Sequence, residues 1–127
     1  MARVTGIGGV FFKARDAEAL RAWYRTHLGL DVQARGGVTF GGTESAGGRE
    51  AVTVWTIFPE TASYFWAPFM INYRVENLAA VLAELRAEGC AVDERVDESE
   101  CGRFGWVQDP DGNRVELWEP PVGGLPG

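Results

Sequence analysis

One carboxylate stands in the middle of an otherwise apolar strand near the end of the chain. The stretch "FGWVQDPDGNRVELWEP" (104–120) is typical of two strands around a tight turn, and Glu116 falls within the second strand. A carboxylate that faces an apolar cleft can act as a general base, or as one ligand of a metal ion. Either chemistry needs partner residues elsewhere in the chain.

Few other residues can supply such partners. The single histidine is His27, and the two cysteines are Cys90 and Cys101; none of them stands in the spacing of a zinc site. No Ser-His-Asp or Cys-His set is possible beyond the single histidine, and the Gly-Gly pairs lack the spacing of a phosphate-binding loop. We expect His27 to be a solvated residue at a helix end or a partner of the helix dipole, and we expect structural roles for both cysteines.

Composition limits the classes of function. The chain has 127 residues, of which 46% are hydrophobic and 24% charged, as expected for one globular domain. The net charge of -6 disfavours nucleic acid as a partner, because binding phosphates requires a basic surface. The chain contains no run of 18 apolar residues and no apolar signal-peptide core, so we expect no membrane partner and a cytoplasmic location.

Glu116 belongs to the second of two similar halves, which are offset by about 60 residues. In each half an apolar strand precedes a capping residue, a helix that ends at glycine, and three short strands. In the first half, Asp16 precedes the helix, and the expected strands cover 6–14, 30–34, 37–42 and 51–58. In the second half, Asn77 precedes the helix, and the expected strands cover 69–75, 91–95, 103–108 and 113–119.

Together with this repeat, three local patterns resemble the vicinal oxygen chelate superfamily, which includes glyoxalases, bleomycin resistance proteins and extradiol dioxygenases. They are "AWYRTHLGL" (22–30), "VENLAAVLAELRAEG" (75–89) and the hairpin of residues 104–120. The resemblance implies an α+β fold of two tandem βαβββ modules that form an open half-barrel with a concave cleft. We expect one domain over 1–120, with modules at about 4–58 and 69–119, a flexible loop at 43–50 and a flexible tail at 121–127.

In metal-dependent members of that superfamily, ligands come from the first and last strand of each module. By this resemblance the last-strand ligand of the second module falls on Glu116, whereas the other three positions hold Gly9, Val54 and Met70. Zinc and iron sites need three or four nitrogen, oxygen or sulfur donors, which these three residues do not offer. We therefore expect no metal ion and no other cofactor.

Strand alternation predicts which residues share the cleft with Glu116. The expected ligand-binding residues are Phe11, Lys13, Val54, Met70, Asn72, Arg74, Trp106, Arg114 and Trp118. The aromatic linker residues Tyr64, Phe65 and Trp66 would form a lid over them. An equally simple interpretation is that the aromatic residues are core and that Arg74 and Arg114 form a structural ion pair with Glu116. In either case, nearby arginines would lower the pKa of Glu116.

Three hypotheses for the function follow. The first is a metal-free small-molecule-binding protein of the glyoxalase/bleomycin-resistance type, whose ligand carries an anionic group to match the cleft cations. The second is a glyoxalase-like lyase, isomerase or dioxygenase that uses Glu116 as a metal ligand or general base. The third is a structural dimerisation domain. We expect a homodimer in each case, because residues such as Trp66 and Phe69 need cover.

Overall fold

The computed structural model describes residues 3–33, 36–41, 52–123 and 125. The expected loop at 43–50 and residues 124, 126 and 127 of the expected tail lie outside this part of the chain. In chain order the elements are β1 (Val4–Ala14), α1 (Ala17–Leu28), β2 (Gly37–Phe40), β3 (Thr53–Pro59), β4 (Phe69–Val75), α2 (Leu78–Ala87), β5 (Ala91–Ser99), β6 (Gly102–Gln108) and β7 (Arg114–Glu119).

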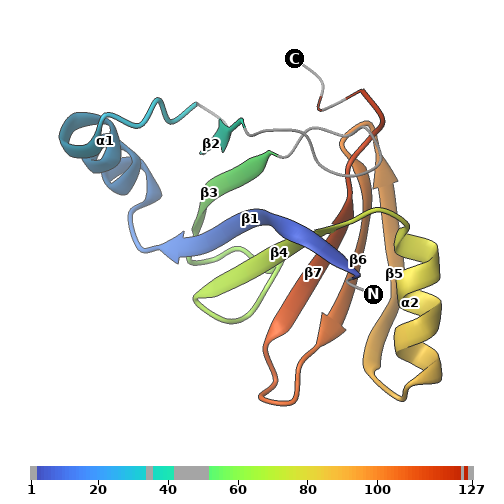
Figure 1. Cartoon of the computed structure of the whole chain (residues 1–127). Coiled ribbons are helices and arrows are strands. Elements are labelled where there is room, and N and C mark those ends of the chain that lie inside the picture. Colours follow the sequence, from blue (N-terminus) through green and yellow to red (C-terminus); the bar gives the residue numbers. More distant parts are fainter. Residues whose placement is uncertain (1–2, 34–35, 42–51, 124, 126–127) are drawn as a thin grey trace.

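The described strands form one curved, open sheet in the order β2-β3-β1-β4-β7-β6-β5 (Figure 1). The first strands of the two halves, β1 and β4, pair antiparallel at the centre. Each of them also pairs in parallel with the last strand of its own half, β1 with β3 and β4 with β7. The sequence-based prediction of an α+β half-barrel is therefore confirmed.

The strand expected at 30–34 does not form over residues 30–33, the described part of that range. Short-range hydrogen bonds hold this segment instead: the amide of Val32 donates to the carbonyl of Leu30 (2.9 Å), and the amide of Gly36 donates to that of Gln33 (2.9 Å). These turns use backbone groups that a strand would need for its ladder. The second half, in contrast, has the complete predicted series of one strand, one helix and three strands.

Both helices begin at the predicted capping residues. The carboxylate of Asp16 accepts a hydrogen bond from the amide of Ala19 (3.0 Å), and the side chain of Asn77 accepts one from the amide of Ala80 (3.1 Å). These bonds satisfy amides that have no partner within the helix. Gly29 follows α1 with φ of +68°, a conformation that glycine adopts without strain.

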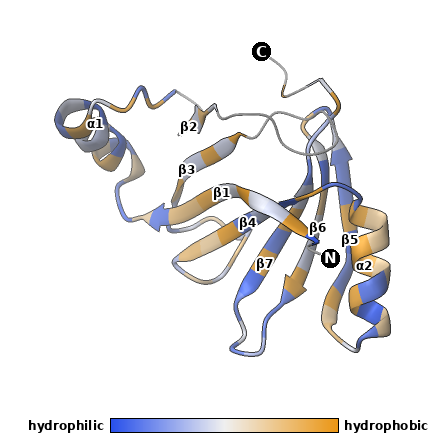
Figure 2. Ribbon diagram, viewed as in Figure 1, coloured by the Kyte–Doolittle hydropathy of each residue, from blue (hydrophilic) through white to orange (hydrophobic). Residues whose placement is uncertain are grey.

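The two helices differ in how they contact the sheet. Helix α2 covers the outer face of the second half beside β5, β6 and β7 (Figure 2). Its apolar side contributes to a buried cluster of Val75, Leu78, Val81, Leu82 and Leu117. Helix α1 lies at the opposite end of the molecule, and none of its residues is buried (Figure 1). Within the described residues, neither helix is long and apolar enough to cross a membrane.

Candidate functional site

The hairpin between β6 and β7 sets the position of Glu116. The carboxylate of Asp109 accepts hydrogen bonds from the amides of Asp111 (3.0 Å) and Asn113 (2.9 Å), and Gly112 adopts a φ of +87°. This turn fixes the register of the two strands, so that Glu116 pairs with Trp106.

Alternation along β7 sends its side chains to opposite faces, as the sequence predicted. Leu117 packs beneath α2 on the outer face. Glu116 and Trp118 are buried on the inner, concave face, and the guanidinium of Arg114 lies there over the ring of Trp106. The carboxylate is thus placed inside the half-barrel.

Glu116 is 1% exposed, and three side chains donate hydrogen bonds to its carboxylate. Oε1 accepts a hydrogen bond from Nδ2 of Asn72 (2.6 Å), and Oε2 accepts one from Nε1 of Trp106 (2.9 Å) and another from the hydroxyl of Tyr64. Burial raises the pKa of Glu116 above its ordinary value, and these three hydrogen bonds oppose that rise. The network also fixes the orientation of the Asn72 amide.

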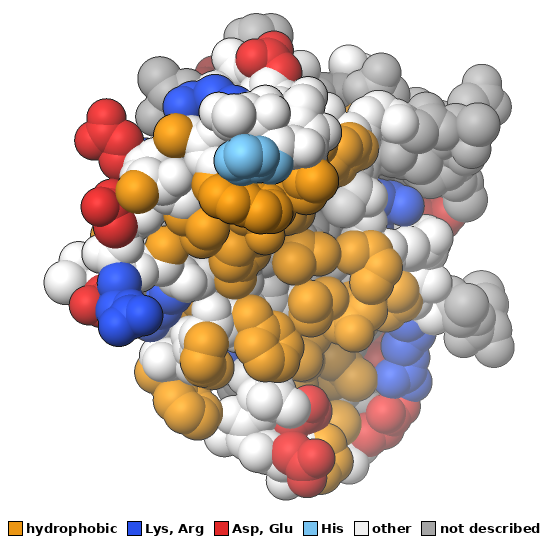
Figure 3. Space-filling view, turned by 90° about the vertical axis from the view of Figure 1, so that its left-hand side faces the viewer, with side chains coloured by type: hydrophobic (Ala, Val, Ile, Leu, Met, Phe, Trp, Pro, Cys, Tyr) orange, Lys and Arg blue, Asp and Glu red, His pale blue; other side chains and the backbone are white. Residues whose placement is uncertain are grey.

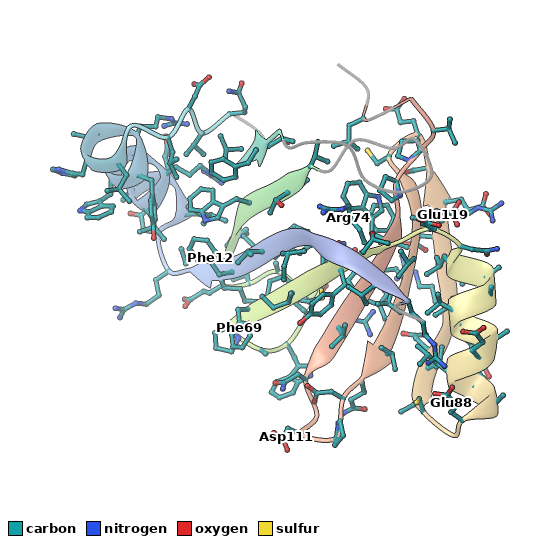
Figure 4. All side chains as sticks on the ribbon, viewed as in Figure 1. Phe12, Phe69, Arg74, Glu88, Asp111 and Glu119 are labelled. Carbon is teal, nitrogen blue, oxygen red and sulfur yellow. The ribbon has the colours of Figure 1, made fainter. Side chains whose placement is uncertain are left out.

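The expectation that arginines lower the pKa of Glu116 holds only for the charge of Arg114, which opposes the rise without outweighing burial, and neither arginine contacts the carboxylate. Arg74 (Figure 4) donates from Nη1 to the backbone carbonyls of Ile7 (2.6 Å) and Val52. Arg114 forms an ion pair with Asp93 (3.3 Å). The expected ion pair of Glu116 with these arginines is therefore absent from the described structure, and burial decides the direction of the shift.

Glycines in β1 make room for the polar side chains of β4. A Cβ atom added to Gly8 would lie 2.2 Å from Oδ1 of Asn72 and 2.8 Å from Cε3 of Trp118. A Cβ on Gly6 would lie 2.2 Å from Nη2 of Arg74. The side chains of Asn72 and Arg74 therefore cross β1 where it has no side chains of its own.

The strand register shows which residue of the second half corresponds to Gly9 of the first, and it differs from the prediction. Gly9 pairs with both Val54 and Asn72, and Asn72 pairs with Glu116. Asn72, and not Met70 as predicted, thus occupies the position that corresponds to Gly9. The register of β1 and β4 shifts between Ile7 and Gly9, an irregularity that the sequence pattern does not reveal.

The residues at these four positions do not fit a metal ion. Asn72 and Glu116 carry oxygen atoms that could bind a metal ion, but both carboxylate oxygens of Glu116 already accept hydrogen bonds. The side chains at Gly9 and Val54 contain no atom that could bind a metal ion. In the described part of the chain, no three His, Cys, Asp or Glu residues lie close enough together to hold a metal ion. A zinc or iron centre needs one or two more ligands than this site provides.

A cleft of about 600 Å³ opens beside this network on the concave face. Four of the predicted ligand-binding residues line it, namely Phe11, Val54, Asn72 and Trp118. The other lining residues are not among the predicted ligand-binding residues: Gly8, Gly37, Val38, Thr39, Thr56, Glu100, Cys101, Phe104 and Leu125. Most of them are small or lie on β2 and at the β5–β6 turn. Alternation along the strand of Glu116 does not predict which way the residues of these segments face.

The remaining predicted ligand-binding residues lie outside this cleft. Met70 and Trp106 are packed with Phe11 and Phe65 in a buried cluster. The ammonium of Lys13 lies 5.0 Å from the ring centre of Phe65. Since no Lys or Arg is found among the described residues that line the cleft, the cations that suggested an anionic ligand are not there.

The linker between the halves covers Glu116, but only in part as predicted. Phe65 is buried in the central cluster, and Tyr64 reaches Glu116 through its hydroxyl. Trp66 points outward and is 75% exposed. It borders a smaller hollow of about 360 Å³, which Trp106 and Arg114 also line.

Comparison with known proteins identifies the family. A model of the Glyoxalase/Bleomycin resistance protein/Dioxygenase superfamily matches residues 6–117. The chain belongs to this superfamily. No sequence among curated proteins matches it significantly.

Solved structures of the superfamily share the fold at low sequence identity. A methylmalonyl-CoA epimerase in complex with methylmalonyl-CoA and NH4+ has a TM-score of 0.71 and 16% identity, over 97% of this chain and 99% of the other. The methylmalonyl-CoA epimerase from Mycobacterium tuberculosis has a TM-score of 0.68 and 20% identity, over 95% and 91%. A superfamily member from Vibrio splendidus 12B01 has a TM-score of 0.55 and 12% identity, over 89% and 97%.

Proposed function

We propose that this superfamily member is a metal-free small-molecule-binding protein whose ligand occupies the cleft beside Asn72. The observation that carries the proposal is the cleft itself, whose walls are mainly apolar or small and whose volume of about 600 Å³ is typical of ligand sites. The carboxylate of Glu116 serves as a structural group in this account, because three donors hold it and none of the described residues completes a metal site around it.

The lining favours a neutral, largely apolar ligand. Phe11, Phe104 and Trp118 offer aromatic surface, and Thr39 and Thr56 offer hydroxyl groups. Among the described residues that line the cleft, Glu100 is the one with a charged side chain, and its charge is negative. The cleft therefore does not favour the anionic ligand group expected from the sequence. One solved relative binds methylmalonyl-CoA, which supports a small-molecule site in a chain of this fold.

The test is titration with the neutral fluorescent probe N-phenyl-1-naphthylamine. Val54→Trp would fill the cleft, whereas Val96→Trp adds the same bulk on β5, where Val96 is exposed and lies outside the cleft. We expect saturable binding to the wild type and to Val96→Trp, and a loss of about tenfold or more in Val54→Trp. Absence of binding to the wild type, or equal binding to both variants, would contradict the proposal.

A second candidate is a cofactor-free isomerase with Glu116 as general base. It is favoured by the raised pKa of the buried carboxylate and by the likeness in fold to methylmalonyl-CoA epimerases. Exchange of the α-proton of methylmalonyl-CoA in D2O, followed by proton NMR, separates the two functions. The binding function predicts the spontaneous rate; a faster rate that is lost in Glu116→Gln would establish the isomerase.

We also propose that the protein forms a homodimer. Hydrophobic side chains gather on the side of the molecule that carries α1 and the histidine (Figure 3). Trp23, Trp66 and Phe69 are each about half exposed or more. Exposed apolar residues of this size support a protein–protein interface. Light scattering coupled to size-exclusion chromatography would give twice the chain mass; the mass of one chain would contradict this.

A further inference from the structure

The side chain of Tyr64 occupies the Glu116 site in the manner of a bound phenol. Its ring is parallel to that of Phe58, with centres 6.0 Å apart and 3° between the planes, and it meets Trp106 edge to face at 6.1 Å and 85°. Its hydroxyl donates to Oε2 of Glu116. Two aromatic walls and one acceptor at the end of the ring are the features that select a phenol among small molecules.

The electrostatics of the site match a neutral phenol. Burial and the neighbouring Glu116 carboxylate raise the pKa of Tyr64, so its hydroxyl keeps its proton and remains a donor. A phenolate in the same position would face the carboxylate without a proton between them. The site therefore discriminates against an anionic ring and against an ether, which has no proton to donate.

The linker anchors Tyr64 in a way that lets its side chain leave. Phe65 is 2% exposed and packs in the central cluster, and the amide of Lys13 donates to the carbonyl of Pro68 (2.8 Å). Tyr64 itself is 36% exposed, so part of this residue is open to solvent. Rotation of this side chain alone can expose the carboxylate, while Phe65 keeps the linker in place.

We propose that Glu116, Phe58 and Trp106 form a binding site for neutral phenols, which Tyr64 fills until a phenolic ligand displaces it. The ligand class is phenols with a para substituent, because the para position of Tyr64 relative to its hydroxyl carries the Cβ atom and leads out of the site. This inference goes beyond the proposed function, since a ligand can occupy the neighbouring cleft while Tyr64 stays in place.

The experiment is calorimetric titration of the wild type and Tyr64→Ala with p-cresol, and with its methyl ether 4-methylanisole. Tyr64→Ala removes the competing ring, so we expect it to bind p-cresol about tenfold or more tightly than the wild type, which must first release Tyr64. We expect no binding of 4-methylanisole. Tyr24→Ala is the matched control, because Tyr24 packs on Trp55 and its hydroxyl makes no hydrogen bond to Glu116, whose three donors are Tyr64, Asn72 and Trp106; this variant should bind p-cresol as the wild type does.

Two outcomes would overturn the inference. One is a folded Tyr64→Ala that fails to bind p-cresol. The other is that Tyr64→Ala binds p-cresol tightly while the wild type binds none, even at p-cresol concentrations that saturate the variant; this would mean that Tyr64 never leaves the site. Should Tyr64→Ala fail to fold, Tyr64→Phe removes only the hydroxyl, and its affinity for p-cresol should exceed that of the wild type; equal affinities would reject the site. Competition separates the two proposals: N-phenyl-1-naphthylamine at a saturating concentration should leave the affinity of the wild type for p-cresol unchanged, because the cleft and the Tyr64 site are distinct.

Discussion

Replacing Gly8 by alanine tests how the polar side chains of the site are accommodated. The added Cβ atom would lie 2.2 Å from Oδ1 of Asn72 and 2.8 Å from Cε3 of Trp118, well inside ordinary van der Waals contact. Neither neighbour can move freely. Asn72 donates to Glu116 (2.6 Å), Trp118 donates to the carbonyl of Cys101 (2.8 Å), and both are almost fully buried. The substitution must therefore displace the amide that holds the carboxylate.

The size of the effect follows from three contributions. Overpacking a rigid site costs about 3 kcal/mol, at the upper end of its usual range. Loss of the hydrogen bond between Asn72 and Glu116 adds about 1 kcal/mol. Alanine also restricts the unfolded chain, which returns about 1 kcal/mol. Gly8→Ala should thus lower the free energy of unfolding by about 3 kcal/mol.

Urea denaturation followed by tryptophan fluorescence measures this change. With a slope of about 2 kcal/mol per molar urea, the midpoint should fall by about 1.5 M. Gly41→Ala is the control, because a Cβ atom there meets no described atom within 4 Å, and its midpoint should stay within about 0.3 M of the wild type. A Gly8→Ala midpoint as close to the wild type as that of the control would refute the packing of Asn72 against β1.

Two further predictions concern Glu116. Glu116→Leu should lower the free energy of unfolding by about 2–4 kcal/mol in urea denaturation, because it leaves the buried donors of Asn72 and Trp106 without an acceptor; an unchanged midpoint would mean that the network contributes nothing. Burial raises the pKa of Glu116. The stability that Glu116 contributes is therefore fully present below the ordinary carboxyl pKa and is lost as the pH rises through the raised pKa. The free energy of unfolding of the wild type, relative to that of Glu116→Gln, should thus fall from about pH 4 toward neutrality. Urea midpoints of both proteins across this range would show it, and a flat or rising difference would contradict the shift.

Local patterns in the sequence predicted much of the fold. Capping residues and glycines marked both helices, and the alternation around Glu116 correctly placed Trp118 on the concave face. The turn at Gly112 fixed the register of the last hairpin. Each of these features depends on residues within one or two turns of chain, which is why a single sequence suffices to find them.

The features that the sequence missed depend on contacts between distant residues. Because of the shift in register between β1 and β4, Asn72 rather than the predicted Met70 lies opposite Gly9. Strand alternation in the sequence gives no sign of such an irregularity. Arg74 shares a face with Asn72, but its long side chain turns to the carbonyl of Ile7. The bond from Tyr64 to Glu116 spans 52 residues, and its one signal was an aromatic linker between two prolines.

The measurement that tests the account most directly is the metal content of the protein. Metal would be quantified by inductively coupled plasma mass spectrometry in untagged protein, as purified and after dialysis against zinc, manganese, nickel and Fe(II) followed by desalting. Because both oxygens of Glu116 accept protein donors and the paired positions hold Gly9, Val54 and Asn72, we expect far less than one metal ion per chain under every condition. About one tightly held metal ion per chain, lost in Glu116→Gln, would contradict the metal-free binding function.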